Sequence, residues 1–221
     1  MSYRNILEWP NPNLKKVSED IDAADEGTTT LVKDLIDTLN VAGGAGLAAP
    51  QIGVTKRAVV LDVSKFNFEN PEKDSDALED KNMWVLFNPR LGDTEGSVKW
   101  EEGCLSVPWH TLSVERSRIL NLTYTNIDGE EKSMSLDMPI SLAVQHECDH
   151  LDGKLILDRV SRLVSRRTRK SIQKKRKKLE ATRKALLSSV EDPTVGKPKA
   201  NRLGRKEIQK RKKRKRMNRV R

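Results

Sequence analysis

His146-Glu147-Cys148-Asp149-His150 forms an H-E-x-x-H motif, the strongest structural signal in this 221-residue chain. On an α-helix, residues four apart share a face, so the two imidazoles can bind one metal ion. Glu147 lies beside them, where a carboxylate can take a proton from a water that the metal activates. The same pattern also occurs by chance on solvated helix faces, so it needs support from the rest of the chain.

Two upstream segments give that support. They are Glu102-Gly103-Cys104-Leu105-Ser106-Val107-Pro108 and Gly44-Ala45-Gly46-Leu47-Ala48-Ala49-Pro50-Gln51. Taken in chain order, residues 44–51, residues 102–108 and the His motif resemble the three signature motifs of the peptide deformylases. The opening of the chain, residues 6–14, is also similar to that family's usual start. The resemblance covers roughly residues 3–165.

The resemblance implies a metal-dependent hydrolase that removes the formyl group from the formyl-methionine of nascent polypeptides and releases formate. It assigns Cys104, His146 and His150 as metal ligands. Three protein ligands and one open position are typical of a catalytic site. The family implies Fe²⁺ as the usual metal, with Zn²⁺, Ni²⁺ or Co²⁺ able to replace it. Thiolate and imidazole preferences alone favour Zn²⁺.

The resemblance also implies a role for each remaining site residue. Glu147 is the expected general acid and base, and the Gln51 side-chain amide and the Leu105 N–H are the expected oxyanion donors. The substrate is expected to contact Gly44, Ala45, Gly46, Gly103, Leu142 and Ala143. Main-chain atoms of Ala45 and Gly103 would pair with the substrate backbone like an added strand. Leu142 and Ala143 precede His146 by one helical turn, so we expect them beside the methionine side chain.

Plainer interpretations exist for several of these residues. A free cysteine such as Cys104 is most often a small buried thiol, and a glutamate such as Glu147 is most often solvated. Cys148 lies about 200° around the helix from His146, so we expect it in the core. The chain departs from many bacterial members at residues 109–111, Trp-His-Thr, where they place an arginine near the pocket mouth.

The hydrophobic patterns predict an α+β fold, with antiparallel sheets around a central helix that carries the motif. An N-terminal helix and a long C-terminal helix complete it. We expect the helices at residues 28–41, 139–151 and 158–189. Strands are expected at residues 57–63, 84–88, 112–114, 119–125 and 132–136. Residues 64–82 are polar and predict a surface loop, and Gly43, Gly44 and Gly46 end the first helix.

The charge is divided sharply along the chain. Residues 1–161 carry 16 Lys and Arg against 28 Asp and Glu, a net charge of −12, whereas residues 162–221 carry 26 against 4, a net charge of +22. We therefore predict a catalytic domain at 1–165 and a basic, helical or disordered extension at 166–221. The basic runs at 174–178 and 210–216 favour contacts with phosphate groups. The resemblance implies that the partner of this extension is the ribosome and its RNA. Two alternative interpretations of the extension are a solvated or disordered tail without a partner and a targeting signal.

Neither a secretory signal nor an apolar run long enough to cross a membrane is visible in the sequence, so we expect a cytoplasmic protein without a membrane partner. The host stays open among a bacterium, a virus in a bacterial host and an organelle. With no export signal, Cys104 and Cys148 are expected to be free thiols or ligands instead of a disulfide.

Two other function classes compete with the hydrolase. One is a ribosome-associated nucleic-acid-binding protein with an inactive metal site, which the presence of Cys104, Glu147 and both histidines disfavours. The other is a zincin-type protease, which takes its third ligand downstream of the motif helix. Only Asp152 and Asp158 offer a carboxylate there before Glu180.

Overall fold

The computed structural model describes residues 3–23, 25–73, 75 and 77–191. Contacts divide the chain into a compact unit, residues 1–172, and a second unit, residues 173–221. The compact unit is an α+β fold with one antiparallel sheet around the motif helix, which confirms the predicted class. No helix in the described ranges has the length and apolar character that a membrane crossing requires.

The sheet has five strands in chain order, each antiparallel to the next. They are β1 (Gly46–Ala48), β2 (Ala58–Asp62), β3 (Met83–Cys104), β4 (Val107–Thr125) and β5 (Glu131–Leu136). Successive side chains of a strand point to opposite faces, so the apolar run of β2 can fill two cores at once. One core takes Val59 and Leu61, and the other takes Ala58 and Val60.

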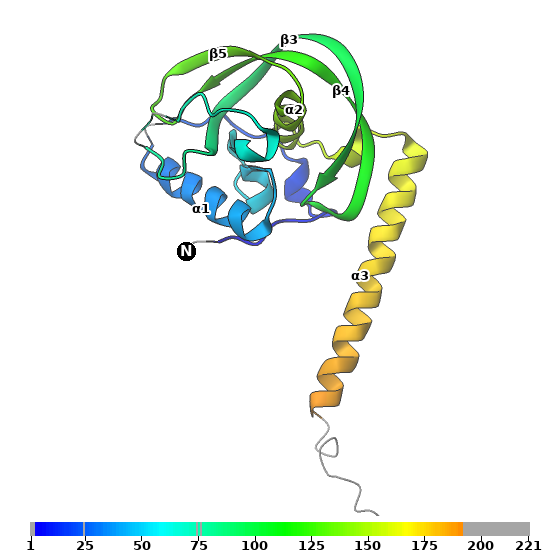
Figure 1. The fold of residues 1–221 in the computed structure, drawn as a ribbon. Helices are drawn as coiled ribbons and strands as arrows, with labels where there is room; N and C mark the ends of the chain where they lie inside the picture. The colour runs from blue at the N-terminus through cyan, green and yellow to red at the C-terminus, as the bar shows by residue number, and fades with distance from the viewer. Residues whose placement is uncertain (1–2, 24, 74, 76, 192–221) are drawn as a thin grey trace, which may run out of the picture. The chain divides into compact units, whose positions relative to one another are not determined.

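Each face of the sheet is covered by one helix. Helix α2 (Ile140–Leu151) lies in the hollow of the curved sheet formed by β3, β4 and β5 (Figure 1). Its Val144 and Cys148 pack into the core around Trp84, as expected for Cys148. Helix α1 (Glu26–Ala42) buries Leu35 and Leu39 against the opposite face. Gly43 ends α1 in the left-handed conformation, at φ 67°, as the glycine cluster predicts.

Strands β3 and β4 are much longer than the sequence pattern predicts. The expected strands at 112–114 and 119–125 are parts of one strand, and 84–88 is only the beginning of β3. Most side chains between Arg90 and Glu101 are exposed, so they carry no apolar alternation. The paired backbones nevertheless hydrogen-bond along the whole hairpin. The expected loop at 64–82 begins with a short 3-10 helix, Val63–Phe66.

A third core joins the hairpin end to both ends of the compact unit. Leu14, from the 3-10 helix Pro12–Lys15, packs with Val114 and with Ile172 of helix α3 (Arg162–Glu191). Helix α3 starts four residues later than predicted because a 3-10 turn, Ile156–Asp158, precedes it. The basic run at 210–216 lies outside the described residues.

Candidate active site

The three predicted metal ligands come together from two elements. Cys104 ends β3, where its pairing with Val107 closes the hairpin, and the two histidines lie one turn apart on the buried helix α2. Cys104 Sγ is 3.3 Å from His150 Nε2, and one ligand atom from each of the three residues lies within 4.8 Å of the others. The spacing fits one small cation between them.

The charges in this cluster favour a cation as well. Burial alone would raise the pKa of the Cys104 thiol, but His150 and His146 outweigh it and bring the pKa down to about 5. Burial likewise opposes protonation of His146, yet Cys104 and Glu102 raise its pKa well above the usual range. A thiolate beside two imidazoles stabilises positive charge among them. The donor set of one sulfur and two nitrogens therefore fits a divalent metal with an open position.

Glu147 is buried with one oxygen unused. Its Oε2 has no hydrogen-bond partner among the described residues. Burial raises the pKa of this carboxyl, partly opposed by His146 and His150. The other oxygen lies against the backbone of Gly46, where a Cβ atom would come within 2.5 Å of Oε1. A desolvated carboxylate without a partner is poised to accept a proton from a nearby group.

His146 is oriented by a buried ion-pair network that the sequence analysis did not identify. Its Nδ1 lies 2.9 Å from Glu102 Oε2. Arg116 binds both oxygens of Glu102, at 2.7 and 2.9 Å, and Asp149 at 2.6 Å. Burial alone would raise the pKa of Glu102, but the bonds from Arg116 and His146 lower it to about 2. A carboxylate on Nδ1–H leaves Nε2 of His146 available to a metal.

Gln51 reaches the site from a 3-10 helix, Ala49–Ile52, that follows β1. Its Oε1 accepts the Ala48 N–H at 2.8 Å, and its Nε2 donates to Ser106 Oγ at 3.2 Å. The amide nitrogen thus faces the hairpin turn that contains Leu105. Because these bonds fix the side chain, Gln51 presents its second N–H in a defined direction.

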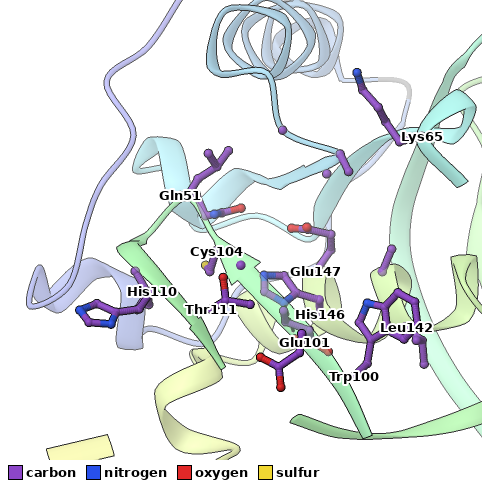
Figure 2. Close-up of a pocket in the computed structure, with 18 of the residues that line it drawn as sticks. Gln51, Lys65, Trp100, Glu101, Cys104, His110, Thr111, Leu142, His146 and Glu147 are labelled. Atoms are coloured by element: carbon purple, nitrogen blue, oxygen red, sulfur yellow. Dashed lines mark hydrogen bonds and ion pairs between the residues drawn. The ribbon is translucent and has the colours of Figure 1, made fainter. Parts of the chain in front are cut away.

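One cavity of about 960 Å³ collects nearly all the predicted site residues. Figure 2 shows Cys104, His146 and Glu147 gathered in it, with Gln51 nearby. The predicted residues that line it are Gly44, Ala45, Gly46, Gln51, Gly103, Cys104, Leu105, Leu142, Ala143, His146 and Glu147. His150 is buried and is not among the residues that line the cavity, but its Nε2 contacts Sγ of Cys104, which does line it.

The cavity mouth includes residues that carried no signal in the sequence. Trp100, Glu101 and Lys65 line the cavity, and Figure 2 shows Trp100 near Leu142. Trp109, one of the three residues at which the chain departs from many bacterial family members, also lines the cavity. This residue is half-exposed and has a positive φ of 66°, an uncommon conformation for a tryptophan.

Sequence comparison finds one family over most of the chain. A family model described as polypeptide deformylase matches residues 3–166. A peptide deformylase of Phenylobacterium zucineum is 36% identical over 175 residues, which cover 79% of this chain and 97% of that protein. One of Rhizorhabdus wittichii is 36% identical over 186 residues, covering 84% and 99%.

Solved structures agree with these relatives. A peptide deformylase from Legionella pneumophila has a TM-score of 0.70 and 33% identity, covering 81% of this chain and 98% of its own. A peptide deformylase from Ehrlichia chaffeensis, in complex with actinonin, has a TM-score of 0.67 and 30% identity, covering 79% and 98%.

Proposed function

Because this chain belongs to the polypeptide deformylase family, we propose that it hydrolyses the formamide of N-formylmethionyl nascent peptides and releases formate, using a divalent metal. The chain is a peptide deformylase by its relatives. The observation that carries the mechanism is Glu147, a buried carboxylate with a free oxygen beside the cluster of Cys104, His146 and His150.

Cys104, His146 and His150 would hold the metal. A divalent ion there acts as a Lewis acid and makes water a stronger acid at neutral pH. Family resemblance favours Fe²⁺, and the thiolate and imidazole donors also suit Zn²⁺, Ni²⁺ or Co²⁺. The contact between Glu102 and Nδ1 of His146 supports this role for His146, because it leaves Nε2 available to a metal.

Glu147 moves the proton. It takes one proton from the attacking water as the water oxygen bonds to the formyl carbon. It then gives this proton to the departing nitrogen as the C–N bond breaks. The products are formate and a free amine, so one water is consumed and no other reactant is needed.

Negative charge develops on the formyl oxygen during the attack. The Gln51 amide N–H and the Leu105 backbone N–H are the proposed donors to it. The bonds from Ala48 and to Ser106 support this role, since a fixed amide needs no reorganisation when the charge appears.

The substrate peptide would lie along β1 and the end of β3. Main-chain atoms of Ala45 and Gly103 are proposed to pair with it, and Gly44 and Gly46, on either side of Ala45, are proposed to contact it through their backbone. Leu142 and Ala143 line the cavity one turn before His146, where they would contact the methionine side chain.

Formate release from formyl-Met-Ala-Ser tests this proposal. We expect release by protein purified anaerobically with Fe²⁺, and at least a 100-fold loss in Glu147→Gln, since positioned acid–base groups contribute about 10²–10⁴-fold. Glu131→Gln, an exposed carboxylate on β5, is the matched control and should retain full activity. If metal binds but neither the unchanged chain nor the control releases formate, the ribosome-binding protein with an inactive site becomes the better proposal.

We further propose that the extension at 166–221 binds ribosomal RNA and leaves catalysis to residues 1–165. Helix α3 carries 12 Lys and Arg against 2 Glu, and its described residues from 173 to 188 are mostly exposed. Tyr124 is the last aromatic residue of the chain, so contacts would go to phosphates instead of stacked bases. Docking there would place the enzyme beside emerging formylated chains in the cytoplasm of a bacterial host.

Co-sedimentation with ribosomes at two salt concentrations tests the extension. Phosphate contacts release counterions, so binding by the full chain should weaken about 10³-fold or more between 50 and 200 mM salt. A chain ending at residue 172 should bind far less and should retain turnover of formyl-Met-Ala-Ser. Equal binding by both chains would contradict the proposal.

A further inference from the structure

Arg159 connects the protein surface to the metal-ligand helix. It follows the 3-10 turn Ile156–Asp158, and its side chain is 41% exposed. Its Nε donates to Asp149 Oδ2 at 2.8 Å, and its Nη2 forms an ion pair with Oδ1. The Asp149 carboxylate is only 6% exposed. A partly solvated guanidinium therefore binds both oxygens of a buried carboxylate next to His150 in sequence.

The same carboxylate continues into the network behind His146. Asp149 Oδ2 also accepts from Arg116, whose guanidinium binds both oxygens of Glu102. Glu102 Oε2 in turn lies 2.9 Å from His146 Nδ1. From Arg159 to Glu102, successive side chains are joined by ion pairs, and their charges alternate in sign.

The charges of the four side chains from Arg159 to Glu102 cancel only when Arg159 is present. Two guanidinium groups face two carboxylates in it. Without Arg159, Arg116 alone would neutralise both Asp149 and Glu102, so its hold on Glu102 would weaken. Glu102 fixes the ring of His146, and partners of a metal-binding imidazole control its orientation and basicity. Loss of charge at Arg159 should therefore change the orientation and basicity of the His146 ring.

We propose that Arg159 is a positioning residue for the metal site and acts on His146 through the three charged side chains between them. This proposal rests on the proposed function, because it requires His146 to be a metal ligand. No member of the network before His146 lines the cavity except Glu102. Its effect should appear in metal retention and kcat, and not in KM.

Metal release without substrate gives the direct test. We would load the protein with Zn²⁺ and measure its rate of loss to a chelator, and load it with Co²⁺ and record the visible spectrum. Arg159→Gln should lose Zn²⁺ about 3–10-fold faster and shift the Co²⁺ bands. This is less than the roughly 10–100-fold of a direct partner. Arg162→Gln, an exposed arginine three residues later, should match the unchanged chain.

Two further variants distinguish a positioning role of Arg159 from a general contribution to stability. Arg159→Lys keeps the charge and should restore most of the metal retention. Ile172→Ala lowers stability near α3 without touching the network, and should hold metal normally. The proposal is overturned if Arg159→Gln holds metal as tightly as the unchanged chain, or if Ile172→Ala loses metal equally fast. Failure of the proposed function is a different result, because the unchanged chain itself would then release no formate from formyl-Met-Ala-Ser.

Discussion

Gly46 illustrates how closely the site is fitted at the level of single residues. A Cβ atom there would lie 2.5 Å from Glu147 Oε1 and 2.8 Å from Leu61 Cδ2. Real Cβ atoms do not approach that closely, so a side chain at this position must push the carboxylate aside. The glycine is required by the position of Glu147 and not by a turn, since Gly46 is the first residue of strand β1.

Gly46→Ala should therefore reduce kcat/KM by about 100-fold, the loss expected when a catalytic group is misplaced by about 1 Å. Steady-state deformylation of a formyl peptide measures it. Gly27→Ala in helix α1 is the control, because a Cβ atom there meets nothing within 4 Å. Similar activity in both variants would mean that Glu147 tolerates displacement.

The residues that the sequence predicted are those with a motif around them. Glu147 and the histidines could be assigned because their spacing has a chemical meaning, and Cys104 because its segment resembles a family motif. Arg116 could not, since it lies in a strand whose neighbours alternate between buried and exposed, where an arginine normally faces solvent. Only the fold brings its guanidinium to Glu102, 14 residues away, and to Asp149, 33 residues away.

At the level of elements, helix α3 changes from packed to exposed along its length. Its first turns are packed: Arg169 lies 5.5 Å from the ring of Trp9, and Ile172 is fully buried with Leu14. Later apolar residues such as Leu179 are more than half exposed. Helical periodicity places Ile172 and Leu179 on one face, so the sequence could predict the helix but not where its packing ends.

Ile172→Ala should lower the free energy of unfolding by about 2–5 kcal/mol, the usual cost of truncating a buried aliphatic side chain. Leu179→Ala, one heptad later on the same helix, should change it by no more than about 0.5 kcal/mol. Urea unfolding of the full chain would measure both. An equal effect of the two substitutions would contradict the division of α3 at residue 172.

At the scale of the whole molecule, the candidate metal site brings together segments that are distant in the sequence. Its proposed ligands come from the tip of a hairpin and from a helix 42 residues further along, and the two elements pack in separate cores. A cation that binds only this assembled arrangement must stabilise the folded state. The three residues predicted as ligands lie together in the structure. The long strands that bring Cys104 to the histidines could not be predicted at full length, because their exposed part has no apolar alternation.

Loading with Zn²⁺ at 100 times its Kd should accordingly raise the stability by about 2.7 kcal/mol. Thermal unfolding with and without a chelator measures the shift. Cys104→Ser should lose most of it, whereas Cys148→Ser, which alters a core thiol, should keep the shift while lowering overall stability. A chelator that leaves the unfolding temperature of the unchanged chain unaltered would argue against a bound metal.

The division after Ile172 also determines how the protein responds to trypsin-like proteases. Residues 173–221 contain 21 Lys and Arg, after which trypsin cleaves unless proline follows, as it does at Lys197. The described ones on α3 are largely exposed. Cleavage at Lys174 would leave Ile172 in its core and the active-site cavity complete. Under the proposed function, a clipped preparation would then deformylate short peptides at full rate while having lost its attraction for ribosomes.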